Sequence, residues 1–126
     1  MRRKSLVAVA AWLEIIVGAT LVADLNLVCE LLFAAAPQGV GVPLGRIAGI
    51  ALFALGVGGL RSTGAGLGGS GTLGLFVYNA GGAIVLAWVA VETALRGVLL
   101  WPGVVLHAVI ACGLLWTSLS GTRRAS

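Results

Sequence analysis

LVAVAAWLEIIVGATLVA, residues 6–23, is an apolar stretch about as long as the hydrocarbon core of a bilayer is thick. Three further stretches of similar length and composition follow at residues 44–60, 73–91 and 99–119. The segments between them are too short to fold as a water-soluble domain. The sequence therefore predicts an all-α fold, an antiparallel bundle of four transmembrane helices that forms one transmembrane domain over residues 1–126.

The composition of the whole chain independently indicates a membrane protein. Hydrophobic residues make up 60% of the sequence and charged residues 10%, and the mean hydropathy is +1.11. The net charge of +4 comes mainly from clusters at the two ends, Arg2 to Lys4 and Arg123 with Arg124. No basic face exists that could follow a phosphate backbone, so the expected partner is the lipid bilayer and not nucleic acid.

The distribution of Lys and Arg predicts the orientation in the membrane. If both termini lie on one face, that face carries Arg2, Arg3, Lys4, Arg61, Arg123 and Arg124. The other face carries only Arg46 and Arg96. By the positive-inside rule, both termini are expected in the cytoplasm of a multi-pass protein of a bacterial inner membrane. Glu14 interrupts the first stretch and no Ala-x-Ala site follows it closely, so we expect a span and not a cleaved signal peptide.

Residues 25–34 have the spacing of a short amphipathic helix. A rise of about 1.5 Å per residue places Asp24 about 27 Å from Leu6, at the outer boundary of the membrane. The helix that follows would then lie along the outer surface, with Asp24 as its N-cap. The alternative is one long tilted helix over residues 6–33, because nothing between Val22 and Asn26 breaks a helix outright.

Polar side chains inside the apolar stretches are the candidates for a functional site, because each is costly in lipid unless it finds a partner or water. Residue counts along the spans place Glu14 about 12 Å and Asn79 about 9 Å from the cytoplasmic boundary, with Tyr78 beside Asn79. Arg46 and His107 lie about 3 and 9 Å from the opposite boundary. The sequence thus predicts an inner and an outer polar layer.

Each of these polar residues has a structural and a functional interpretation. A carboxyl group in hydrocarbon can exchange a proton near neutral pH, which proton-coupled transport uses, but Glu14 is favoured as a residue that joins the first span to Asn79 or Tyr78. His107 is favoured as a hydrogen-bonded residue of the bundle, because one histidine provides neither bis-histidine haem ligation nor a metal set. Arg46 is expected to extend toward the interface.

Other motifs exclude common chemistries. Gly64, Gly66 and Gly69 have dinucleotide-fingerprint spacing, but they join two membrane spans and lack the βαβ context, so a flexible linker is expected. Cys29 and Cys112 fall at different depths and form no Cys-x-x-Cys pair. No catalytic residues, metal site or cofactor are predicted.

Small residues predict how the helices pack. Gly45 and Gly49 lie about one helical turn apart in the second span, and Gly81 with Gly82 gives the third span a similar small face. We therefore expect tight packing of the second span on the third, with the second span central or in contact with another subunit.

Two resemblances follow from these motifs. The chain combines Leu13-Glu14 and Gly18, LGRIAGIAL at residues 44–52 with Gly56, Tyr78-Asn79, and LWPGVVLHA at residues 100–108. This combination resembles a family of small four-span bacterial membrane proteins of unknown function. The resemblance implies a shared site or shared packing at Glu14, Arg46, Asn79, Trp101, Pro102 and His107. Asp24, where that family commonly has proline, and the longer glycine-rich loop depart from its pattern.

The first span alone is similar to that of the small multidrug resistance transporters. The similar stretch is LEIIVGAT at residues 13–20, which contains the one embedded glutamate. The aromatic and glycine pattern of the third helix of those transporters is absent around residues 78–88. The similarity covers one helix, and dimeric antiport is implied by that helix alone.

The sequence suggests three possible functions. The leading hypothesis is a non-enzymatic membrane bundle, either a homo-oligomer or an accessory subunit of a larger membrane assembly. The alternative is a small proton-coupled transporter or carrier of a small molecule, in which Glu14 titrates. A membrane enzyme that uses Glu14 with His107 is disfavoured, because their estimated depths differ by about 9 Å.

Overall fold

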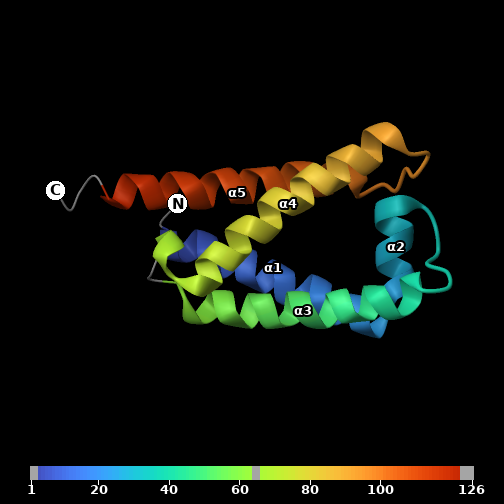
Figure 1. Cartoon of the computed structure of the whole chain (residues 1–126), viewed down its shortest axis with the longest axis horizontal. Helices are drawn as coiled ribbons and strands as arrows, with labels where there is room; N and C mark the ends of the chain where they lie inside the picture. Colours follow the sequence, from blue (N-terminus) through green and yellow to red (C-terminus); the bar gives the residue numbers. More distant parts are fainter. Residues whose placement is uncertain (1–2, 64–65, 123–126) are drawn as a thin grey trace.

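The computed structural model describes residues 3–63 and 66–122, which form helices and connecting segments without strands (Figure 1). The elements are α1 (Arg3–Ala23), α2 (Leu25–Phe33), α3 (Gly41–Arg61), the short 3-10 helix η1 (Gly66–Gly68), α4 (Ser70–Glu92) and α5 (Leu100–Thr122). Among the described residues, α1, α3, α4 and α5 are long and apolar enough to cross a membrane. The predicted all-α bundle with four membrane-length helices and one short helix is confirmed.

The long helices form two antiparallel pairs. α1 packs most extensively on α3, and α4 packs on α5. α1 begins and α5 ends at the same end of the bundle, beside η1, whereas α2 lies across the opposite end (Figure 1). α4 runs obliquely, from beside α3 near η1 toward α5 at the other end, so the two pairs are close together near η1 and further apart near α2.

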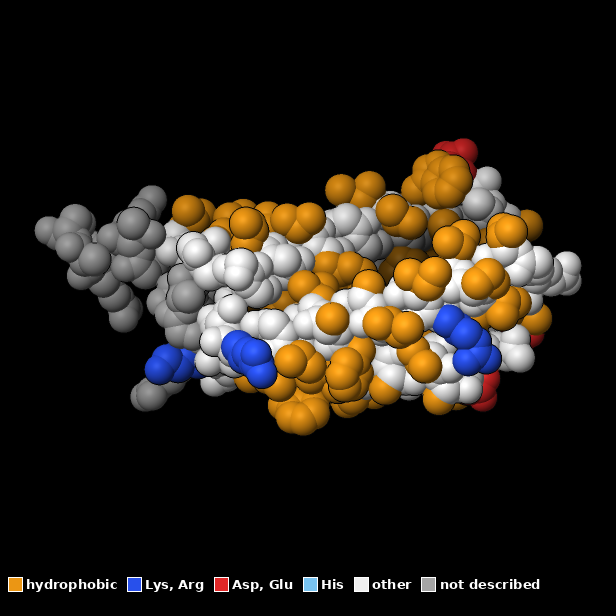
Figure 2. Space-filling model, turned by 60° about the horizontal axis from the view of Figure 1, so that its bottom comes forward, with side chains coloured by type: hydrophobic (Ala, Val, Ile, Leu, Met, Phe, Trp, Pro, Cys, Tyr) orange, Lys and Arg blue, Asp and Glu red, His pale blue; other side chains and the backbone are white. Residues whose placement is uncertain are grey.

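The outer surface of the bundle is apolar along most of its length. Large hydrophobic side chains on every long helix are exposed, among them Trp12, Ile47, Ile84 and Trp116. Figure 2 shows one face of the bundle, where apolar side chains lie between charged groups toward the two ends. Such a surface suits hydrocarbon and not water. Arg2, Arg123 and Arg124 of the predicted basic clusters lie outside the described residues.

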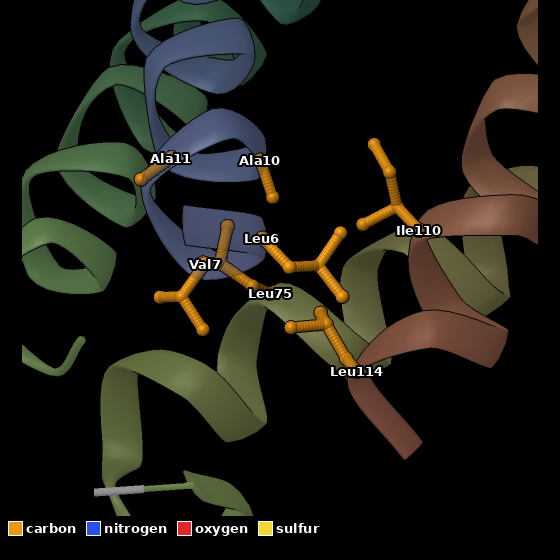
Figure 3. Close-up of a cluster of buried hydrophobic side chains, with 7 residues drawn as sticks. All are labelled: Leu6, Val7, Ala10, Ala11, Leu75, Ile110 and Leu114. Carbon is orange, nitrogen blue, oxygen red and sulfur yellow. The ribbon is translucent and has the colours of Figure 1, made fainter. Parts of the chain in front are cut away.

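The interior is packed most closely near the η1 end. Side chains from three helices meet there (Figure 3): Leu6, Val7, Ala10 and Ala11 of α1, Leu75 of α4, and Ile110 and Leu114 of α5. All are at most 7% exposed. This cluster fixes α1, α4 and α5 relative to one another, and the polar residues described below lie directly next to it.

The boundary between α1 and α2 falls at Asp24, as the amphipathic interpretation predicted. The Asp24 side chain accepts a hydrogen bond of 3.0 Å from the Leu27 backbone N–H, which caps the start of α2. Asp24 itself is non-helical, at φ −140° and ψ 81°, so the alternative of one continuous helix over residues 6–33 is wrong.

The C-terminal end of α2 is held by the segment that joins α4 to α5. Backbone N–H groups of Arg96, Gly97 and Leu99 donate to the carbonyl groups of Phe33, Leu32 and Leu31, respectively. These bonds satisfy carbonyl groups that the end of a helix leaves free. A side chain at position 97 would collide with the Leu32 backbone, so the close approach requires glycine there. α2 is therefore fixed across the end of the bundle at both of its termini.

Gly49 and Gly56 of α3 pack against α1, whereas Gly59, near the η1 end, packs against Leu75 of α4. A Cβ atom added to Gly49 would lie 2.8 Å from the Gly18 carbonyl oxygen, and one added to Gly56 would lie 2.5 Å from that of Ala11. Gly45 contacts Leu25 of α2, whereas an added Cβ at Gly81 would meet no atom within 4 Å. The close approach at Gly49 was predicted, but its predicted neighbour, α4, is wrong, because the neighbour is α1. Small residues on two spans do not specify which helices meet.

Candidate functional site

Three polar side chains from three helices form one hydrogen-bonded cluster inside the bundle. Asn79 of α4 lies between Glu14 of α1 and His107 of α5. Its Nδ2 atom donates to Glu14 Oε1 over 3.3 Å, and its Oδ1 atom lies 2.8 Å from His107 Nδ1. Asn79 is fully buried and Glu14 is 3% exposed. The cluster therefore crosses the interior from α1 to α5 through a single amide.

The hydrogen bonds of the Asn79 amide determine which nitrogen of His107 carries a proton. Asn79 Nδ2 has two hydrogens, and it donates one to Glu14 and one to the Leu75 carbonyl oxygen, 2.9 Å away. The amide oxygen is left as an acceptor, so His107 Nδ1 must be the donor in the remaining bond. His107 is accordingly either the Nδ1–H tautomer or doubly protonated, and its position within the cluster depends on this proton.

The apolar core determines the position of the cluster. Glu14 lies one helical turn from Ala10 on α1, and Asn79 lies one turn from Leu75 on α4. His107 lies one turn before Ile110 on α5. Each polar residue thus shares a helix face with a member of the core, and the three faces meet because the core members meet (Figure 3). The cluster is the next layer of the same interior.

His107 was predicted in an outer layer, and this prediction is wrong. Residue counting placed it at a different depth from Asn79, whereas the two side chains are hydrogen-bonded. The counting assumed helices perpendicular to the membrane that begin at common boundaries, but α4 runs obliquely across α5 (Figure 1). The signal that would have located His107 is its spacing from Ile110, which is on the core face of α5.

Tyr78 contacts His107 through its ring. The two ring centroids are 5.5 Å apart and the planes meet at 78°, an edge-to-face arrangement. The imidazole also lies beside Gly82, where an added Cβ would be 3.5 Å from three ring atoms. No hydrogen bond joins the Tyr78 hydroxyl to another residue of the described part of the chain. Tyr78 therefore positions the imidazole by packing.

A cavity of about 600 Å³ lies beside the cluster. It is bounded by α1, α3 and α4 and covered by α2, where the two helix pairs are furthest apart. Its lining is apolar except for Tyr78 and Cys29, and Gly81 and Gly82 also border it. Glu14, Asn79 and His107 do not line it. Tyr78 is thus the side chain that touches both the cavity and the polar cluster.

Arg46 lies apart from this cluster and from the cavity. It is exposed near the α2 end of α3, and its Nη1 atom donates to the Val22 carbonyl oxygen over 2.7 Å. Val22 is in the last turn of α1, where carbonyl groups lack helical partners and a positive charge is favourable. Arg46 therefore caps α1, and its expected extension toward the membrane interface stays a prediction.

The cysteines are separate and both are free thiols. Cys29 is half-buried on α2 at the cavity wall, and Cys112 is exposed on α5. Within residues 3–63 and 66–122, no group of three or more His, Cys, Asp or Glu side chains is placed to hold a metal ion.

Comparison with protein-family models, curated proteins and solved structures found no match to this chain. The resemblance to the four-span bacterial family, and that of the first span to multidrug transporters, therefore stay predictions. The fold supports a coarser description, a small protein with four helices suited to spanning a membrane.

Proposed function

We propose that this protein is a non-enzymatic integral membrane bundle that acts as a subunit of an oligomer or of a larger membrane assembly. The observation that carries this proposal is that Glu14, Asn79 and His107, from three helices, are hydrogen-bonded to one another. Every buried side-chain N or O atom of the described residues has a partner, and the cluster does not line the cavity. Its hydrogen bonds join three helices, as polar side chains commonly do between transmembrane helices.

The outer face of α3 supports an assembly role. Ala54 is exposed, and an added Cβ at Gly58, one turn further along, would meet no atom within 4 Å. Small residues four apart let a second transmembrane helix approach closely. The α1 contact uses other glycines of α3, Gly49 and Gly56, so a side chain added at Gly58 would point away from the rest of this chain.

The test is the mass of the particle extracted from native membrane in a lipid-preserving polymer. The proposal predicts a dimer or larger assembly. Gly58→Leu should lower the assembled fraction at least several-fold. Cys112→Leu, at an exposed position on α5, is the control and should leave the assembly intact. Extraction of the unchanged protein as a lone monomer would overturn the proposal.

A second candidate is a small proton-coupled carrier with Glu14 as the titrating group. One observation favours it: Tyr78 borders the cavity and also packs on His107, so a molecule in the cavity would be one side chain from the cluster. A change in the protonation of the cluster could alter the cavity wall through that contact.

Flux measurements in proteoliposomes separate the two candidates. The carrier predicts pH-dependent uptake of a cation or small metabolite that Glu14→Gln abolishes. The subunit proposal predicts no such uptake by the purified protein. Full pH-dependent flux in the Glu14→Gln variant would eliminate Glu14 as the coupling group.

We further propose that both ends of the chain are cytoplasmic and that the host membrane is a bacterial inner membrane. Lys4 and Arg61 lie near the η1 end of the bundle. Three of the four acidic residues, Asp24, Glu30 and Glu92, lie near the α2 end together with Arg46 and Arg96. Arg3, which begins α1, adds a third Lys or Arg to the η1 end against two at the α2 end, and this difference supports the orientation.

A further inference from the structure

We propose that the cavity beneath α2 is a binding site for one hydrocarbon chain of a bilayer phospholipid. This inference concerns a site that the subunit role does not require. It rests on the lining of the cavity, on where the cavity opens, and on what the surrounding membrane can supply.

The lining of the cavity suits hydrocarbon and excludes water as a stable occupant. A space of about 600 Å³ is large enough for a ligand of ordinary size. Water remains in a buried space only where two or more polar groups bind it, and apolar cavities stay dry. Here the only lining side chains with polar atoms are Tyr78 and Cys29, on different helices. An apolar chain would make favourable contacts with most of this surface.

The exposed residues of the lining show where the cavity opens. Ala48 and Ala51 of α3 and Gly81 and Val85 of α4 are all exposed and all border it, whereas Leu52 is buried at 7% exposure. The opening therefore lies between α3 and α4. Ala51 is about 15 Å along α3 from Gly41, which places the opening within the hydrocarbon region.

α2 closes the other route into the cavity. Cys29 and other residues of α2 form the wall at that end, and hydrogen bonds hold α2 both at Asp24 and at the α4–α5 segment. A molecule in water would have to displace α2, whereas a molecule in the bilayer meets a lateral opening. Phospholipid chains are the most abundant apolar molecules on that side, so we commit to them as the occupant.

The length of the cavity fits a chain that lies alongside the helices. The lining extends from α2 to Tyr78, which is about 21 Å along α4 from Glu92. This length is about two-thirds of a hydrocarbon core of about 30 Å. Measured along the oblique α4, the cavity is therefore longer than the half of the core that one leaflet fills. At its deep end the chain would contact Tyr78, whose ring packs on His107.

The test compares variants that fill the cavity with a matched control. Gly81→Phe adds a ring where an added Cβ meets no atom within 4 Å, and Ala51→Phe fills the cavity from α3. Val77→Phe is the control, because Val77 is exposed on the same helix but does not line the cavity. Each protein is purified in mild detergent, checked for helical content by circular dichroism, and examined by native mass spectrometry.

We expect the unchanged protein and Val77→Phe to retain one phospholipid per chain, and both cavity-filling variants to lose it at least several-fold. Modification of Cys29 by N-ethylmaleimide should also become several-fold faster when the unchanged protein is delipidated, but not in Gly81→Phe. Equal lipid retention by folded Gly81→Phe and the unchanged protein would overturn the proposal. Retention of an apolar molecule other than phospholipid would also overturn it. None of these outcomes depends on the oligomeric state, so the site and the subunit role are tested separately.

Discussion

His107 Nδ1 donates a hydrogen bond to Asn79 Oδ1 over 2.8 Å, which joins α5 to α4 through a proton on one particular ring nitrogen. His107 is the single histidine of the chain, so its signals can be assigned without ambiguity. We predict that ¹⁵N NMR of labelled protein in micelles at neutral pH will show a protonated Nδ1. A neutral ring protonated at Nε2 alone would contradict the arrangement of the cluster, because two acceptors would then face each other.

Asn79→Leu should destabilise the bundle, because the substitution leaves Glu14 and His107 without their shared partner. A buried polar group that loses its hydrogen bond typically costs about 1–3 kcal/mol. The measurement is reversible unfolding in mixed micelles, followed by circular dichroism.

Tyr78→Phe provides the comparison for that experiment. The Tyr78 hydroxyl makes no hydrogen bond to the described residues, and the ring contact with His107 survives the change. We expect a shift below about 0.5 kcal/mol, as for most substitutions that remove no partner. Equal stability of Asn79→Leu and Tyr78→Phe would show that the cluster does not stabilise the fold.

Gly18→Val should disrupt the pairing of α1 with α3. An added Cβ at Gly18 would lie 2.6 Å from both the Gly49 carbonyl oxygen and the Phe53 backbone nitrogen, neither of which can rotate away. Overpacking typically costs about 1–3 kcal/mol, and a backbone clash belongs at the upper end. Gly81→Val, where an added Cβ is unobstructed, should change the unfolding free energy much less. If the two variants are equally stable, α1 and α3 are not in close contact.

The Cys29 thiol should react slowly with maleimides at neutral pH. Burial raises the pKa of Cys29, and the negative charge of Glu30 raises it further. Because the thiolate is the nucleophile, a raised pKa means less reactive thiolate at neutral pH and a labelling rate that climbs only at more alkaline pH. The pH at which the labelling rate reaches half of its maximum should be higher for Cys29 than for the exposed cysteine of a Gln38→Cys variant. Glu30→Gln should lower this midpoint for Cys29. A Cys29 midpoint at or below the Gln38→Cys value would refute this environment.

The sequence was sufficient to predict the helices but not all of their neighbours. Apolar runs determine which segments cross a membrane, and Asp24 supplies a cap that ends one helix and starts the next. Pairing depends on helix tilt and on which small faces meet, and Gly49 has the same local sequence whether it faces α1 or α4. Helix tilt also determines the depth of His107. Residue counts along straight helices therefore placed His107 and Asn79 at different depths, although the two side chains are hydrogen-bonded.

The cavity was beyond sequence prediction for a related reason. It exists because α4 leaves α3 toward the α2 end, and Gly81 borders empty space there instead of packing on a helix. A small residue in a membrane span is compatible with either outcome. Only the three-dimensional arrangement of helix pairs distinguishes a close contact from an opening.

We predict that α1, α3, α4 and α5 cross the bilayer, with Glu14, Asn79 and His107 turned toward one another. The most direct test of this topology is labelling by a membrane-impermeant maleimide of single cysteines placed before and after α3, in a background without Cys29 and Cys112. Gln38→Cys precedes α3 and Ser70→Cys begins α4, and both positions are exposed. We predict that Gln38→Cys is labelled in intact cells and that Ser70→Cys is labelled only after permeabilisation. Labelling of both from the same side would contradict the account, because α3 would then not cross the membrane.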